Sequence, residues 1–302
     1  MILASSIIAF ALQVGPNPNA GALPGVPDEL LNRPPRPGEE QAAQVSPEST
    51  WLAECLALAE DDPARAHSLA QLRRNESFGT NRILANHCLG LAATELGLWD
   101  DAITAFGAAR DETPDDELSA RARFGAMAGN AALASGDATQ ARTVLETAQQ
   151  DAQAAASAPL HAIAATDLAR ALVSLGENEA ALTQLESATT LTPDASESWL
   201  LKATLLRRLD RFDEAQVAIE RAGEIAPLDP QIGLEAGVIA VLSGRDEAAR
   251  ASWQSVIDIQ PASAAALTAQ DYLAQLGPPA EPAELPAAAT PATEPDASED
   301  AL

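Results

Sequence analysis

One pattern of small and large residues recurs about every 34 residues along most of this 302-residue chain. Each copy places a small residue before a turn and an alanine five residues after it. The small residues are Gly97, Gly136, Gly176, Asp210 and Gly244. The alanines are Ala102, Ala141, Ala181, Ala215 and Ala249. A period of this length leaves room for two helices and a turn, so it predicts stacked helical pairs rather than one central core.

The positions after each alanine show how such pairs pack. A large apolar residue follows four places later, at Phe106, Leu145, Leu185, Ile219 and Trp253. A small residue follows three places after that, and the copies close with Pro114, Gln153, Pro193, Pro227 and Pro261. In the fourth copy, Ala215, Ile219 and Ala222 therefore share one stripe of a helix. The prolines predict the end of each second helix, because proline lacks an amide donor and clashes with the preceding turn.

The copies resemble tetratricopeptide repeats, in which each unit is a helix, a turn and a helix. Trp199 stands at the fourth place of its unit, where this family characteristically carries tryptophan. The resemblance covers roughly residues 50–276 and implies an all-α, right-handed helical solenoid with disordered N- and C-terminal segments. The expected units are a partial one at 50–80, then 83–116, 122–155, 162–195, 196–229 and 230–263, with a capping helix at 262–276. Because Gln153 replaces the proline, the second helix of 122–155 is expected to run on through Ala152–Ala156.

Both ends of the chain differ from the repeats. Met1–Ala11 is apolar and uncharged, and its length suits a signal peptide (1–14) rather than a membrane span, although a basic segment before it is missing. Residues 15–49 are rich in proline, which indicates a linker. Residues 277–302 form an acidic tail rich in proline and alanine, which we expect to be disordered. We therefore expect a periplasmic or secreted protein; a cytoplasmic protein with a buried or disordered apolar end is the alternative.

The charge of the chain limits its partners. A formal net charge of −26 argues against nucleic acid, whose phosphates need clustered Lys and Arg. After the N-terminal segment, no stretch approaches the roughly 18 apolar residues of a membrane helix. The partners that remain are proteins or peptides.

No constellation of residues predicts catalysis. His67, His87 and His161 have no serine or cysteine partner in a nucleophile motif, and no glycine-rich phosphate loop is present. Zinc held by Cys55, His87 and Cys88 would lack a fourth protein ligand and the usual spacing. We therefore expect no enzyme, no cofactor and no metal.

Cys55 and Cys88 fall on the first helices of adjacent units, and two interpretations of them stay open. Export would place them in an oxidising compartment and favour a disulfide. Against it, neighbouring helix axes lie about 8–10 Å apart, whereas a disulfide needs Cα atoms within about 7 Å. The alternative is a pair of small buried thiols.

The family resemblance also implies a binding face, because the first helix of each unit lines a concave groove there. The corresponding places hold His87, Leu91, Glu95, Arg123, Asn130, Thr166, Arg170, Arg207, Arg208, Leu234 and Val238. We hypothesise that an acidic peptide or a C-terminal carboxylate docks against Arg123, Asn130, Arg170 and Arg207, since guanidinium groups hold carboxylates bidentately. Alternatively, these arginines pair with acidic residues of neighbouring helices.

The function expected from the sequence is non-enzymatic protein–protein interaction, as an adaptor or scaffold in the bacterial cell envelope. One alternative is a cytoplasmic, co-chaperone-like adaptor. Another, of a different class, is a regulatory subunit associated with an enzyme.

Overall fold

The computed structural model describes residues 47–278, and in that range the chain forms thirteen α-helices and no strand. The expected signal peptide, most of the expected linker and nearly all of the acidic tail lie outside the described residues. The helices are α2 (Pro47–Asp61), α3 (Pro63–Glu76), α4 (Thr80–Glu95), α5 (Trp99–Glu112), α6 (Leu118–Ser135), α7 (Ala138–Ala154), α8 (Ala158–Ser174), α9 (Asn178–Leu191), α10 (Ser196–Arg208), α11 (Phe212–Ile225), α12 (Pro230–Leu242), α13 (Asp246–Ile259) and α14 (Ala264–Leu276). Because α2 begins at Pro47, the last three residues of the expected linker are helical.

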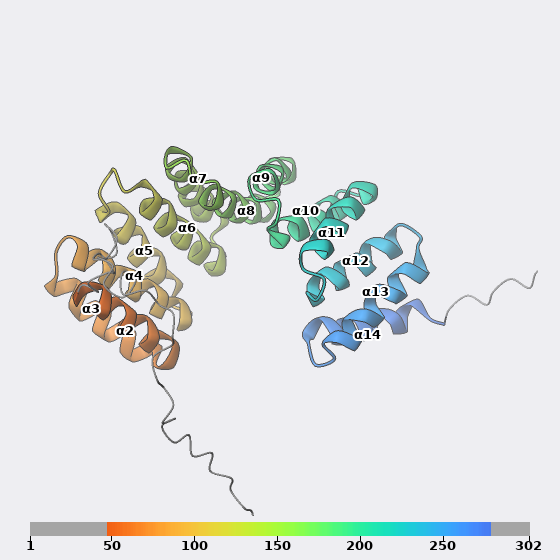
Figure 1. The fold of residues 1–302 in the computed structure, drawn as a ribbon, viewed down its shortest axis with the longest axis horizontal. Coiled ribbons are helices and arrows are strands. Elements are labelled where there is room, and N and C mark those ends of the chain that lie inside the picture. Colours follow the sequence, from red (N-terminus) through yellow and green to blue (C-terminus); the bar gives the residue numbers. More distant parts are fainter. Residues whose placement is uncertain (1–46, 279–302) are drawn as a thin grey trace, which may run out of the picture. The chain divides into compact units, whose positions relative to one another are not determined.

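From α3 to α14, each helix packs on the next one in the chain (Figure 1). Some first helices also contact the first helix of the following pair, as α6 does with α8, α10 with α12 and α12 with α14. Contact restricted to near neighbours is the defining property of a solenoid. The predicted all-α helical solenoid is confirmed.

The turns inside the helical pairs have one backbone conformation. The residues at the predicted turn place, Gly97, Gly136, Gly176, Asp210 and Gly244, all have positive φ, between 58° and 84°. Glycine reaches this left-handed region without steric cost, and aspartate tolerates it better than most residues. The turn therefore recurs even in the copy that lacks glycine.

Proline sets the length of the second helices. α5, α9, α11 and α13 are each 14 residues long and end two residues before their proline. α7, whose copy has Gln153 in place of proline, has 17 residues and runs to Ala154. The expected extension is present as far as Ala154 and ends two residues short of Ala156, whose φ is 50°.

The core forms where a small residue of a first helix meets the large residue of the second helix. A Cβ atom added at Gly90 would lie 2.5 Å from the Phe106 ring, and one added at Gly237 would lie 2.1 Å from the Trp253 indole. A Cβ atom added at Gly129 would meet Leu145 in the same way, at 2.4 Å. These glycines are required by close helix packing, because each aromatic or leucine side chain occupies the space of the missing Cβ.

Cys55 of α2 and Cys88 of α4 are joined as a disulfide, with their Cα atoms 6.2 Å apart. The distance between helix axes overstates the distance between facing Cα atoms, because each helix has a finite radius. Cα atoms lie about 2.3 Å from a helix axis, so Cα atoms that face each other across axes 8–10 Å apart can come within roughly 3–5 Å. The oxidation state of this pair in the cell stays a prediction.

No helix among residues 47–278 combines the length and the apolar character needed to cross a membrane.

Candidate binding groove

Two adjoining hollows lie between the first helices α4, α6, α8 and α10. The first, here called the apolar hollow, has a volume of about 450 Å³ and is lined by Leu91, Thr94, Trp99, Phe106, Arg123, Ala126, Met127, Asn130, Ala131, Ala134, Leu160, Ile163 and Asp167. The second, the polar hollow, has a volume of about 580 Å³ and is lined by Asn130, Pro159, Ala162, Ile163, Thr166, Asp167, Arg170, Thr192, Asp194, Ala195, Glu197 and Ser198. The two share Asn130, Ile163 and Asp167, so they form one continuous groove.

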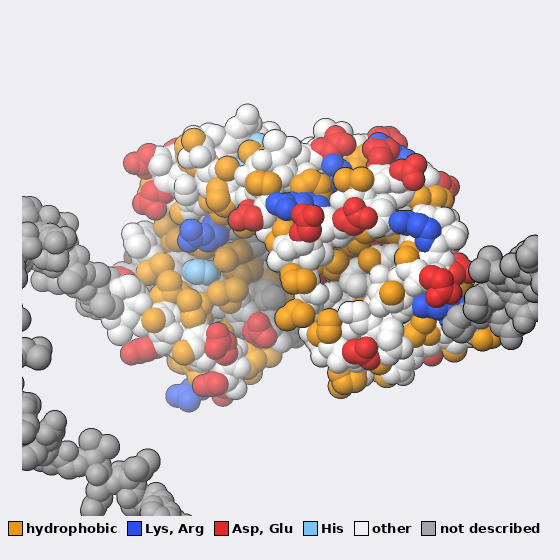
Figure 2. Space-filling model, turned by 45° about the vertical axis from the view of Figure 1, so that its right-hand side comes forward, with side chains coloured by type: hydrophobic (Ala, Val, Ile, Leu, Met, Phe, Trp, Pro, Cys, Tyr) orange, Lys and Arg blue, Asp and Glu red, His pale blue; other side chains and the backbone are white. Residues whose placement is uncertain are grey.

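Apolar side chains from successive first helices give this groove its character. Leu91, Met127 and Ile163 come from α4, α6 and α8 and line the apolar hollow. Ile163 is 51% exposed although the residues around it on α8 are buried. One face of the array is hollowed, with apolar side chains gathered beside the hollow and charged side chains around them (Figure 2). A concave apolar surface with a few convergent polar groups is the usual form of a binding site.

Arg123 supplies a positive charge at the rim of the apolar hollow. Its side chain is exposed, and no ion pair involving it occurs among the described residues. Its neighbour His87 lies edge-on to Phe124, with ring centroids 5.3 Å apart. Burial, and secondly the charge of Arg123, lower the pKa of His87, so this imidazole is neutral near pH 7. The guanidinium of Arg123 is therefore available to an acidic ligand.

A buried carboxylate, Asp167, lies where the two hollows meet. Arg170 donates hydrogen bonds to Asp167 and to Glu197 of α10. Burial raises the pKa of the Asp167 carboxyl, while Arg170 and a hydrogen bond from Asn130 act in the opposite direction. Arg170 therefore already donates to two carboxylates and has few donors left for a ligand.

The other two predicted arginines have different surroundings. Nε of Arg207 donates to Oε1 of Glu235 at 2.6 Å, which ties α10 to α12, and Arg207 lines neither hollow. Arg208 lines a third, smaller hollow of about 260 Å³ between α8, α9 and α10. Arg170 and Arg207 are therefore paired with acidic residues of the array, which is the alternative that the sequence left open.

The remaining positions expected on the groove are scattered. Leu91 lines the apolar hollow, Thr166 lines the polar hollow and bonds Ser198 of α10 at 2.9 Å, and Glu95 is exposed. Leu234 accepts a hydrogen bond from Trp253, and Val238 lines a separate hollow of about 280 Å³ between α12, α13 and α14. The structure therefore brings together the residues of α4, α6 and α8, and leaves those of α12 apart.

Reasoning from the sequence missed Asp167, Met127 and Ile163. Asp167 carried a signal that was available, because it is one carboxylate within the apolar helix run from Ala162 to Leu172. Ile163 also carried one, because it stands 13 residues before Gly176 as Arg123 stands 13 residues before Gly136. Met127 carried none, since a large apolar residue in an apolar helix normally indicates core. Among the described residues, no group of three His, Cys, Asp or Glu side chains is arranged to hold a metal ion.

Comparison with known proteins supports the assignment of the array. The sequence model of the tetratricopeptide repeat matches residues 126–196 and 166–231. A TPR repeat-containing protein of Rhizobium etli is 34% identical over 100 residues, which is 32% of this chain and 48% of that protein. The chain thus spans about half the length of this curated relative.

Solved structures show the same fold. The array resembles PilF of Pseudomonas aeruginosa with a TM-score of 0.59 and 14% identity, covering 75% of this chain and 97% of that one. It resembles PilW, a type IV pilus biogenesis factor, with a TM-score of 0.59 and 16% identity, covering 73% of this chain and 98% of that one. At these identities the likeness concerns the fold alone. The repeat register, the helical pairs and the family match together identify tetratricopeptide repeats in the matched part of this chain, residues 126–231.

Proposed function

We propose that the array is a non-enzymatic scaffold that holds an extended segment of a partner protein along α4, α6 and α8. The observation that supports this is the continuity of the apolar and polar hollows through Asn130, Ile163 and Asp167. A groove lined by three successive helices suits an extended chain, whose side chains enter one after another. Exposed apolar surface such as Ile163 gains free energy when a partner covers it.

The partner segment carries an acidic group next to an apolar side chain. The apolar side chain enters between Leu91, Met127 and Ile163, and the acid meets Arg123 with Asn130 beside it. Arginine suits this contact because its planar group offers two parallel donors to a carboxylate. Arg170 and Arg207 do not take part, since Asp167, Glu197 and Glu235 occupy them.

Peptide selection with the full chain tests this function. From a random-peptide phage library, the chain is expected to select peptides with Asp or Glu next to Leu, Ile or Phe. Arg123→Glu is expected to change the selected charge from acidic to basic, because it reverses the charge at the rim. Arg142→Glu is the matched control, since Arg142 lies on the second helix α7 and pairs with Glu177.

Two results would contradict the proposal. One is a selection with no acidic preference, and the other is an Arg123→Glu variant that selects the same peptides as the parent chain. Arg170→Glu is a poorer test, because it would place a third carboxylate beside Asp167 and Glu197 and disturb the fold.

We also propose that the scaffold acts outside the cytoplasm, in the periplasm or as a secreted protein. The apolar segment Met1–Ala11 and the pairing of Cys55 with Cys88 support this, since disulfides persist in oxidising compartments. N-terminal sequencing of the mature protein decides it. Removal of residues 1–14 is the expected result, and an intact Met1 would favour the cytoplasmic alternative.

A further inference from the structure

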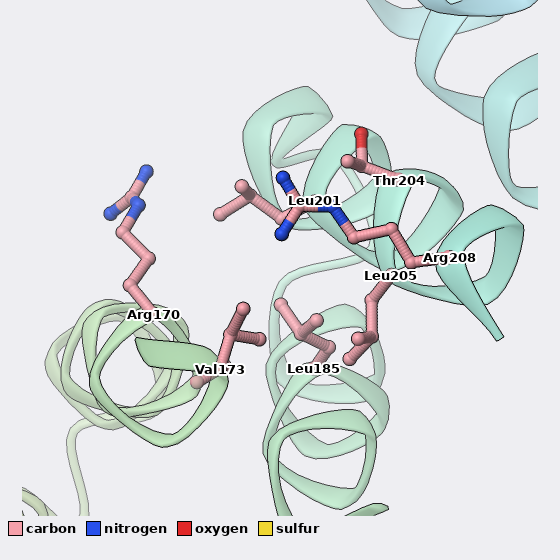
Figure 3. Close-up of a pocket in the computed structure, with 8 residues that line it drawn as sticks. Arg170, Val173, Leu185, Leu201, Thr204, Leu205 and Arg208 are labelled. Atoms are coloured by element: carbon pink, nitrogen blue, oxygen red, sulfur yellow. The ribbon is translucent and has the colours of Figure 1, made fainter. Parts of the chain in front are cut away.

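The residues that line the hollow beside Arg208 favour one class of ligand. Its apolar wall is formed by Val173 of α8, Leu185 of α9, and Leu201 and Leu205 of α10. Figure 3 shows Val173, Leu185 and Leu205 side by side, with Leu201 and the guanidinium groups of Arg170 and Arg208 on one side of them. A volume of about 260 Å³ fits one leucine-sized side chain rather than a long segment.

Arg208 is the charged group of this hollow that remains available. Its side chain is exposed, and no ion pair involving it occurs between residues 47 and 278. Arg170, by contrast, is held by Asp167 and Glu197. The ligand that fits therefore has one large apolar side chain with an acidic group within a few residues of it.

The chain itself contains such a segment. Residues 279–302 include six acidic residues and no basic one, and only two large apolar residues, Leu285 and Leu302. Leu302 follows closely on Glu299 and Asp300. We propose that residues 299–302 of the same chain dock on this hollow, with the Leu302 side chain against Leu201 and Leu205 and the two acids at Arg208.

The topology places the start of this segment on the correct side of the array. α8, α10, α12 and α14 are all first helices, so they run in the same direction and end at the same edge. α10 ends at Arg208 and α14 at Leu276, and neighbouring helix axes are about 10 Å apart, which gives roughly 20 Å between the two ends. Arg250 of α13 donates to the carbonyl oxygens of Gly277 and Pro278 and fixes the point where the segment leaves.

Residues 279–302 are long enough to reach the hollow. At about 3.3 Å per residue the extended segment spans up to about 80 Å, several times the distance required. Leu285 would reach it only with the chain almost fully extended, which favours Leu302 as the docked residue. Because the segment is attached, its effective concentration near the hollow is in the millimolar range, so even a weak contact is occupied.

The high negative charge of the protein does not prevent this contact. At physiological ionic strength the Debye length is about 8 Å, so charges farther away are largely screened. Arg208 lines the hollow and has no ion pair among the described residues, while Arg170 is already held by Asp167 and Glu197. The hollow shares Arg170 with the polar hollow, so docking would place the acidic segment next to the groove.

Site-specific photo-cross-linking in the full chain tests the inference. Ala301→p-benzoylphenylalanine places the reactive group next to Leu302 without replacing it. The expected cross-links join residue 301 to α8, α9 or α10 of the same molecule, as mapped by mass spectrometry. Arg208→Glu is expected to lower their yield about fivefold, the range of one exposed ion pair, and Leu302→Asp about tenfold.

Controls separate docking from chance contact and from partner binding. Arg221→Glu changes the same charge on α11, where Arg221 pairs with Glu224, and should leave the yield unchanged. Cross-links spread over the array, a yield that Arg208→Glu does not alter, or adducts between two molecules would each overturn the proposal. The experiment contains no partner, so its outcome is independent of the function proposed for the apolar hollow.

Discussion

The close packing of Gly237 on Trp253 predicts that Gly237→Ala lowers the free energy of unfolding, although alanine has the higher helix propensity. Gly237→Ala would place a methyl group 2.1–2.5 Å from three atoms of the indole. The indole has little room to move, because Trp253 is 4% exposed and the ring centroid of Tyr272 lies 5.2 Å from that of the indole at a tilt of 51°. The indole also donates through Nε1 to the carbonyl oxygen of Leu234 at 3.1 Å. Overpacking costs about 1–3 kcal/mol and loss of the hydrogen bond about 1 kcal/mol. Alanine gains about 1 kcal/mol in helix propensity, so a net destabilisation of about 2 kcal/mol is expected.

Gly107→Ala is the matched control. Gly107 lies inside α5, and an added Cβ there would have no atom within 4 Å. Gly107→Ala should therefore gain only the higher helix propensity of alanine, which raises the free energy of unfolding by up to about 1 kcal/mol.

Urea unfolding followed by circular dichroism measures the free energy of unfolding of both variants. Because solenoids can unfold unit by unit, hydrogen exchange in α12 and α13 should show that the loss in Gly237→Ala is local. If both variants change stability by the same amount and in the same direction, the close packing of Gly237 on Trp253 is wrong.

Three further predictions concern the core, the disulfide and the buried carboxylate. Ala215 is fully buried, so Ala215→Gln should cost about 2 kcal/mol in urea unfolding; no change would mean that Ala215 faces water. Reduction of the Cys55–Cys88 bond, which closes a separation of 33 residues, should lower the free energy of unfolding by about 3–4 kcal/mol. Two free thiols per unfolded, non-reduced chain from its native compartment would exclude that bond. Burial raises the pKa of the Asp167 carboxyl above 3.8, so the folded state favours the protonated form. The stability that this protonated carboxyl contributes is fully present below pH 3.8 and is lost as the pH rises through the raised pKa. Asp167→Asn should therefore gain stability relative to the parent chain between pH 4 and pH 7, and a pH-independent difference would contradict the raised pKa.

The sequence was sufficient for the fold because each repeat is specified locally. Positive φ at Gly176 and Asp210 follows from the residue at the turn place, and the end of α9 two residues before Pro193 follows from the chemistry of proline. Five copies of such signals give the register without any knowledge of long-range contacts. Helical pairing in a solenoid is itself a contact between neighbours in sequence, so local reasoning also reaches the packing.

The binding face was predicted less well, because charge pairing depends on side chains from different helices. The sequence located Arg170 and Arg207 on the first helices, yet whether they are available depends on Glu197 and Glu235, which lie 27 and 28 residues farther along the chain. Asp167, three residues before Arg170, was a local sign of pairing that Arg123 lacks, but the sequence of α10 alone does not show that Glu235 occupies Arg207. The disulfide was left open for a similar reason, since only the relative rotation of α2 and α4 decides whether Cys55 faces Cys88.

The sequence by itself therefore determined the repeat, the turns and the lengths of the helices, all of which depend on backbone conformation within one unit. The tertiary structure alone decided which side chains are exposed between units. Ile163 lines a groove instead of the core, and Asp167 is buried beside Arg170, because helix–helix spacing and side-chain direction fix these outcomes. Both quantities arise only when neighbouring units are stacked.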